Sequence, residues 1–266
     1  MSTFPPSEQL FGIGMGLAQQ LAKAIPSTTP PRDAKFYCYA AMRYFFAKSY
    51  KSYQAIRLLW RAGYVEDALM LARTIFEIAL QAQYASIEPS RARLFLEFHS
   101  VSRYRLCKKL QRAGAIDPPF PTGLSPTQLA ELKQAHDQVA CNYAKSEHWW
   151  GHGIDWLAEQ CGKDMYRHYL STYAMQSDFV HSGVVSADQY FRSDDGCTPI
   201  GCYPFPSDRL DIPWETTYFF VLIASLTTAA FGIDLEEKIR EAFDALNNLS
   251  PAAHGAPPSV SAGSAP

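Results

Sequence analysis

The stretch Val65–Ile87, VEDALMLARTIFEIALQAQYASI, decides the fold class. Its middle part is apolar on nearly every side of a helix, which is typical of a helix buried in a protein core. Glu66 and Asp67 lie in its first turn, where acidic side chains suit the helix dipole. Pro89 disfavours helical backbone at the residue before it, so the helix should end near residue 87. The stretch therefore predicts a central helix of an all-α protein.

Apolar residues recur at helical spacing on both sides of this stretch. Prolines, glycines and capping residues divide the flanking sequence into further helices. We expect them at Glu8–Ile25, 33–61, 90–113, 126–147, Ile154–Cys161, 164–181 and Thr216–Ile233. The fold class that follows is an all-α bundle of about seven or eight helices.

One segment has the signals of β structure. The short runs Gln189–Arg192 and Ile200–Tyr203 flank the turn sequence Asp194–Gly196. We expect one β-hairpin at about 184–206, inserted before the last long helix. The helical body should support it, because an isolated two-stranded ribbon is only marginally stable.

The length of 266 residues is long for one domain and short for two. We expect an N-terminal helix and linker over 1–32 and a single helical domain over 33–250. The Ala-, Pro-, Ser- and Gly-rich residues 251–266 should be a disordered tail.

Charge limits the partners of the chain. The formal net charge is −2, and the 24 Lys and Arg residues look scattered rather than gathered into a stripe. Nucleic acid is therefore not the expected partner, although a small local basic patch stays open.

The compartment follows from the N-terminus and the cysteines. No secretory signal is visible, which predicts a cytoplasmic, reducing location and free thiols for the six cysteines. Cys197 and Cys202 form the one close pair, which we interpret as chance. Thr216–Ile233 lacks charge over 18 positions, but its threonines and acidic flanks favour a buried helix over a membrane span.

No metal or other cofactor is expected. His148 and His152 have the four-residue spacing of metal ligands on one helical face. Gly151 and Gly153 make a continuous helix doubtful there, and no acidic third ligand follows. The paired tryptophans next to them indicate a core or the mouth of a pocket.

Arg73 and Glu77 are the only charged residues in the apolar middle of Val65–Ile87, and they lie one turn apart on one face. They should be partly buried together. A buried ion pair often adds little net stability. The pair can therefore have a functional role, or it can fix how neighbouring helices dock.

A second polar pair ends the helix at 164–181. Tyr166, Tyr169, Leu170 and Tyr173 define an apolar face, and Ser177 and His181 continue this line at steps of four. Asp178 could orient the imidazole ring. A hydrolase triad is not indicated, because the sequence lacks a Gly-x-Ser-x-Gly elbow and a source of an oxyanion hole.

The segment ALMLARTIFE at 68–77, the pair Trp150–Gly151, and a Tyr-rich helix that ends in SDFVH at 177–181 resemble a bacterial family of helical proteins of unknown function, family 5677. The resemblance spans about 64–183. It implies that Arg73, Glu77, Ser177 and His181 form one polar cluster between two helices. It brings no established activity.

A weaker likeness is to the nucleotide-binding helical domains of higher eukaryotes and prokaryotes, many of which are ribonucleases with an Arg-x(4–6)-His motif. Arg93–His99, RLFLEFH, has that spacing. The polar residue that precedes the motif in that family, and the motif's position on a late helix, are not reproduced.

Three hypotheses for function follow, and whether the chain is an enzyme stays open. The first is a ligand-sensing or interaction module, in which Arg73, Glu77, Ser177 and His181 bind a small polar or anionic molecule. The second is an RNA-cleaving effector of a toxin or phage-defence system, with His99 or His181 as acid and base. In that hypothesis Arg73 or Arg93 holds the phosphate. The third is a structural helical homo-oligomer.

Overall fold

The computed structural model describes residues 5–25, 35–112, 125–143, 148–174, 176–177 and 210–250. In chain order the elements are α1 (Pro6–Ala24), α2 (Phe36–Arg61), α3 (Val65–Ile87), α4 (Pro89–Arg112), α5 (Pro126–Val139), η1 (Ala140–Asn142), α6 (Ile154–Gln160), α7 (Lys163–His168), η2 (Tyr169–Tyr173), α10 (Asp211–Phe231) and α11 (Glu236–Asn248). The prediction of an all-α protein is confirmed, and these residues contain no strand. The hairpin predicted at 184–206 and the tail predicted at 251–266 lie outside the described residues.

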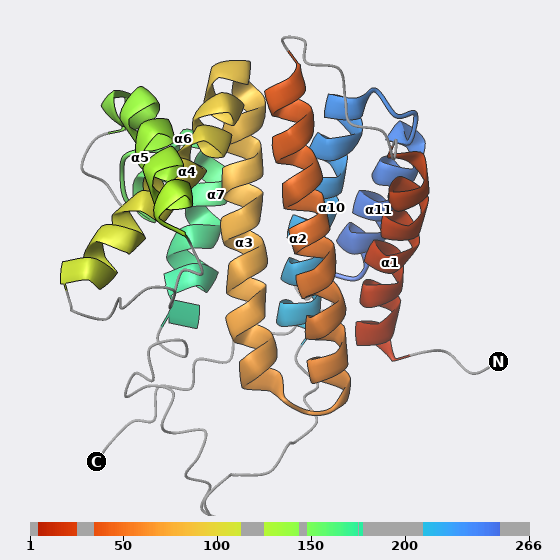
Figure 1. The fold of residues 1–266 in the computed structure, drawn as a ribbon. Helices are drawn as coiled ribbons and strands as arrows, with labels where there is room; N and C mark the ends of the chain where they lie inside the picture. The colour runs from red at the N-terminus through yellow and green to blue at the C-terminus, as the bar shows by residue number, and fades with distance from the viewer. Residues whose placement is uncertain are drawn as a thin grey trace, which may run out of the picture.

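The antiparallel pair of α2 and α3 forms the centre of the molecule (Figure 1). Gly63 ends α2 with φ of 83°, a left-handed conformation that glycine adopts without strain. The chain reverses there, and α3 runs back along α2. Helix α10 packs on both, and α1 and α11 pack on α10. On the other side, α4 packs on α2 and α3, α5 on α4, and α6 on α3 and α7.

Helix α10 contains most of the uncharged stretch Thr216–Ile233 and, as predicted, packs in the core. Thr217, Thr227 and Thr228 donate their hydroxyls to the carbonyl oxygens four residues earlier, at 2.7–2.8 Å. These bonds let polar side chains be buried among apolar neighbours. Among the described residues, no helix has the length and apolar character to cross a membrane.

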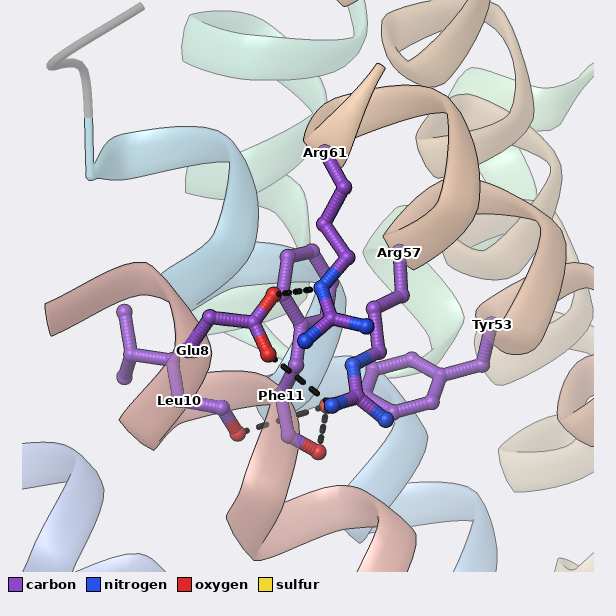
Figure 2. A network of polar contacts seen from close by, with 6 residues as sticks. All are labelled: Glu8, Leu10, Phe11, Tyr53, Arg57 and Arg61. Atoms are coloured by element: carbon purple, nitrogen blue, oxygen red, sulfur yellow. Dashed lines mark hydrogen bonds and ion pairs between the residues drawn. The ribbon is translucent and has the colours of Figure 1, made fainter. Parts of the chain in front are cut away.

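Figure 2 shows how α1 is attached to α2. The carboxylate of Glu8 accepts hydrogen bonds from Arg57 Nη2 at 2.9 Å and from Arg61 Nε at 2.6 Å. The fully buried hydroxyl of Tyr53 lies 3.3–3.4 Å from two carbonyl oxygens of α1 and 2.8 Å from Thr217 Oγ1 in α10. Helix α1 therefore shares one core with α2 and α10.

Two predicted helices differ most from the structure, and one helix was not predicted. The helix expected at 126–147 ends at Val139, where a 3₁₀ turn follows. The helix expected at 164–181 divides into α7 and the π-helix η2. The amphipathic helix α11 was not expected at all, although Ile239, Ala242 and Leu246 recur on one face and are buried.

Candidate functional site

The polar pair predicted in the central helix is present. Arg73 Nε in α3 donates a hydrogen bond to Glu77 Oε1, one turn later, at 3.2 Å. The Arg73 side chain is 15% exposed and the Glu77 side chain 35% exposed. Both therefore lie at the edge of the core, where an anion from outside could reach the guanidinium group.

The helix formed by α7 and η2, with the helical residues 174 and 176–177 that follow them, completes the network. We call this whole segment the α7–η2 helix. Arg73 Nη2 donates to Tyr173 Oη at 2.6 Å, and Arg73 Nη1 donates to Ser177 Oγ at 3.2 Å. The Tyr173 hydroxyl donates in turn to Glu77 Oε1 at 2.9 Å. We call Arg73, Glu77, Tyr173 and Ser177 the Arg73 cluster. It joins two helices through side chains about a hundred residues apart in the sequence.

Tyr173 is the centre of this network, and the sequence analysis treated it only as part of an apolar face. Its ring centroid lies 4.3 Å from the Arg73 guanidinium carbon, and the side chain is buried. Burial, followed by the negative charge of Glu77, raises the pKa of Tyr173 to about 12. The hydroxyl is therefore protonated at neutral pH and can donate to Glu77.

The apolar face predicted for the helix at 164–181 is only partly correct. Tyr173 points inward, as predicted, but Leu170 is 56% exposed. A π-helix has i→i+5 hydrogen bonds, so its turn holds more residues than an α-helical turn. Relative to α-helical spacing this displaces Tyr173, at the end of the segment, more than Leu170 near its start, so the exposure of Leu170 has no explanation in the π-helix.

Further polar side chains lie beside the cluster, and the sequence analysis missed them. His168 Nδ1 is 4.0 Å from Glu215 Oε1, and burial lowers the pKa of His168. Thr216 Oγ1 is buried and has no hydrogen-bond partner among the described residues. Gln176 is 3% exposed. These residues come from α10 and from the α7–η2 helix, so only the tertiary fold brings them to one place.

A narrow gap lies between Tyr173 of the cluster and the neighbouring side chains of α10. Tyr173, Gln176, Glu215, Thr216 and three apolar side chains line about 210 Å³ of unfilled space. The gap has no room for a water molecule. In this conformation the interface of the three helices is closed.

The other predicted site residues have different locations. His181 and Asp178 lie outside the described residues. Arg93 is exposed in α4 and bonds Glu97 at 2.6 Å. His99 is also exposed and follows Arg93 by six residues, which corresponds to about 120° of separation around an α-helix. These two side chains therefore point in different directions from α4.

The two histidines considered as metal ligands each stack on a tryptophan. The His148 ring lies 4.4 Å from Trp150, and the His152 ring lies 4.2 Å from Trp156. Gly151 between them has φ of 86°, which interrupts the helix as the glycine pattern indicates. The described part of the chain has no group of three or more His, Cys, Asp or Glu side chains arranged for a metal ion.

The four described cysteines are free thiols, as predicted: Cys38, Cys107, Cys141 and Cys161. Cys197 and Cys202 lie outside the described residues.

Fold and site define an all-α protein in which a polar cluster joins α3 to the α7–η2 helix in an otherwise apolar core. The model of a family of unknown function (DUF5677) matches residues 39–198, which is more than half of the chain. The chain therefore belongs to this family, and the resemblance seen in the sequence is confirmed. The matched region includes the whole Arg73 cluster and excludes α1, α10 and α11.

No curated protein and no solved structure matches the chain.

Proposed function

We propose that this protein is a ligand-sensing module that binds a small anion at the Arg73 cluster. The observation that carries the proposal is the bonding of Arg73. Its guanidinium group has five N–H donors, and the described residues use three of them, for Glu77, Tyr173 and Ser177. Within the described part of the chain the other two donors have no partner, and they suit a carboxylate or phosphate group, which guanidinium binds with matching geometry.

Stability alone is a poor reason for such a cluster. Replacing a buried ion pair by apolar residues of similar volume is often neutral or stabilising, whereas removing one partner is costly. Four polar side chains between two helices therefore call for a second role. A group of side chains that includes a perturbed pKa in a partly buried place is a reasonable candidate for binding.

Binding in this place would change the contact between the helices. Ser177 and the Tyr173 hydroxyl accept hydrogen bonds from the same guanidinium group, so an anion bound to Arg73 would compete with them. Glu77 is 35% exposed, so its carboxylate can turn to solvent as the anion arrives. The π-helix at Tyr169–Tyr173 is the natural point for a change of register, since π-turns often occur at functional sites. Ligand binding would thus be transmitted to the α7–η2 helix.

A thermal-shift panel tests this function. The purified chain is heated with inorganic phosphate, a nucleoside monophosphate, a dicarboxylate and chloride as the control anion. An anion at about 100 times its Kd adds about 2.7 kcal/mol of stability. For a domain of this size each kcal/mol raises Tm by about 2–4 °C, so the expected shift is about 5–10 °C.

Two variants make the result specific. Arg73→Met removes the guanidinium group and should abolish the shift, while Arg43→Met makes the same change at an exposed position of α2 and should keep it. Equal shifts in both variants would place the binding elsewhere. No shift with any anion would favour the reading of the cluster as a purely structural contact.

A further inference from the structure

A groove lies on α4 and α5, away from the residues of the Arg73 cluster. The C-terminal half of α4, together with His136 of α5, lines an open groove of about 890 Å³. We call it the α4–α5 groove. Its lining includes the cationic residues Arg105, Lys108, Lys109 and Arg112, together with Tyr104 and His136.

The cations form a stripe. Arg105, Lys108, Lys109 and Arg112 follow the spacing i, i+3, i+4 and i+7, which puts them on one face of α4 over about 10 Å. No acidic residue occurs between Glu97 and Arg112, and the described lining of the groove contains none. This stripe is the kind of small local basic patch that the scattered distribution of Lys and Arg left open.

Aromatic rings lie among these cations. The Tyr104 ring is 4.5 Å from the ring of His136 and 5.9 Å from Lys108 Nζ. The Phe98 ring is 5.9 Å from the guanidinium carbon of Arg105. Sites that bind single-stranded nucleic acid combine cationic side chains, which contact phosphates, with aromatic rings, on which bases stack.

We propose that the α4–α5 groove binds single-stranded RNA or DNA through its phosphate backbone, with a base stacked on Tyr104. The groove is concave and has a volume typical of ligand sites, whereas a membrane-surface helix would bury a broad apolar face beside its cations. An acidic protein segment would use the cations but would not need the rings. The proposal is independent of the anion site at Arg73, which lies in α3.

Fluorescence anisotropy with a labelled oligouridine tests the proposal on the full chain. Binding is measured from about 50 to 200 mM salt, where counterion release dominates. Each neutralised phosphate of a single strand contributes about −0.7 to the slope of log K against log salt. Three or four contacts should give a slope of about −2 to −3.

Two double variants with the same change of net charge distinguish binding in the groove from a general effect of charge. Lys108→Glu with Arg112→Glu should weaken binding at least about tenfold and flatten the slope by about 1.4. Lys48→Glu with Lys51→Glu makes the same change of net charge at exposed positions of α2 and should change the affinity less than about twofold. Circular dichroism and Tm of both variants check that they fold. Equal losses in the two variants would overturn the proposal.

Tyr104→Leu tests the stacked base. Because stacking contributes about 1–3 kcal/mol per base, affinity for oligouridine should fall at least about fivefold with the salt slope unchanged. Inorganic polyphosphate, which has no bases, should not distinguish this variant from the wild type. If Tyr104→Leu binds oligouridine normally, or if phosphatidylserine vesicles bind and oligouridine does not, the groove is not a nucleic-acid site.

Discussion

Gly14 offers a test in which local and tertiary effects predict opposite signs. It lies in α1 against the fully buried Tyr53, and a Cβ atom added at Gly14 would lie 2.6 Å from Cζ and 2.8 Å from Cε1 of the Tyr53 ring. Both distances are too short for carbon atoms in contact. Tyr53 cannot move aside easily, because its hydroxyl is hydrogen-bonded to Thr217 Oγ1 at 2.8 Å and its ring stacks on Phe220 at 4.6 Å.

The magnitudes decide the sign of the Gly14→Ala change. Helix propensity alone favours alanine by about 1 kcal/mol. Overpacking costs about 1–3 kcal/mol, and each hydrogen bond of Tyr53 that is lost costs about 1 kcal/mol more. We therefore expect Gly14→Ala to lower the free energy of unfolding by about 1–3 kcal/mol.

Urea denaturation followed by circular dichroism measures this change. Gly12 and Gly16 are the matched controls, since a Cβ at either position meets nothing within 4 Å. Alanine there should raise the free energy of unfolding by about 0.5–1 kcal/mol each. If Gly14→Ala is as stabilising as Gly12→Ala, the packing of α1 against Tyr53 is wrong.

Two further predictions concern titrating groups. Burial by itself would raise the pKa of Glu8, but its bonds with Arg57 and Arg61 outweigh burial and hold the pKa below the usual value of 4.5. The stability that this carboxylate contributes, about 1 kcal/mol, is therefore present above about pH 4.5 and lost as the pH falls through the lowered pKa. In urea titrations the wild type should exceed Glu8→Gln at neutral pH and converge with it in acid, and a gap that does not depend on pH would contradict this. Burial raises the pKa of the Cys161 thiol to about 12, whereas Cys141 is exposed. Iodoacetamide at about pH 8, read by peptide mass mapping, should modify Cys141 in the folded protein and Cys161 only after unfolding, and equal rates would refute the burial of Cys161.

Much of the fold could be predicted because its signals are local. The bounds of α3 agree with the sequence, since an apolar run, an acidic first turn and Pro89 all act within a few residues. The Arg73–Glu77 pair follows from the same periodicity. The basic stripe from Arg105 to Arg112 is equally local, because its i, i+3, i+4 and i+7 spacing can be found in the sequence.

The rest depends on tertiary contacts. Nothing local in Tyr169–Tyr173 indicates a π-helix, so the sequence predicted one continuous α-helix there. The approach of His168 to Glu215 joins residues from α7 and α10, which are far apart in the sequence. Neither residue has a sequence neighbour that indicates this contact.

The most direct test of the Arg73 cluster as a binding site is the free energy of unfolding of one combined variant. Arg73→Met, Glu77→Leu, Tyr173→Phe and Ser177→Ala together replace the polar cluster by apolar side chains. The measurement is made with and without the anion that gives the largest thermal shift. If the cluster is kept for binding, the variant should be within about 1 kcal/mol of the wild type without the anion, and only the wild type should be stabilised by it. A loss of more than about 3 kcal/mol in the variant, with no response of the wild type to any anion, would mean that the cluster serves stability alone.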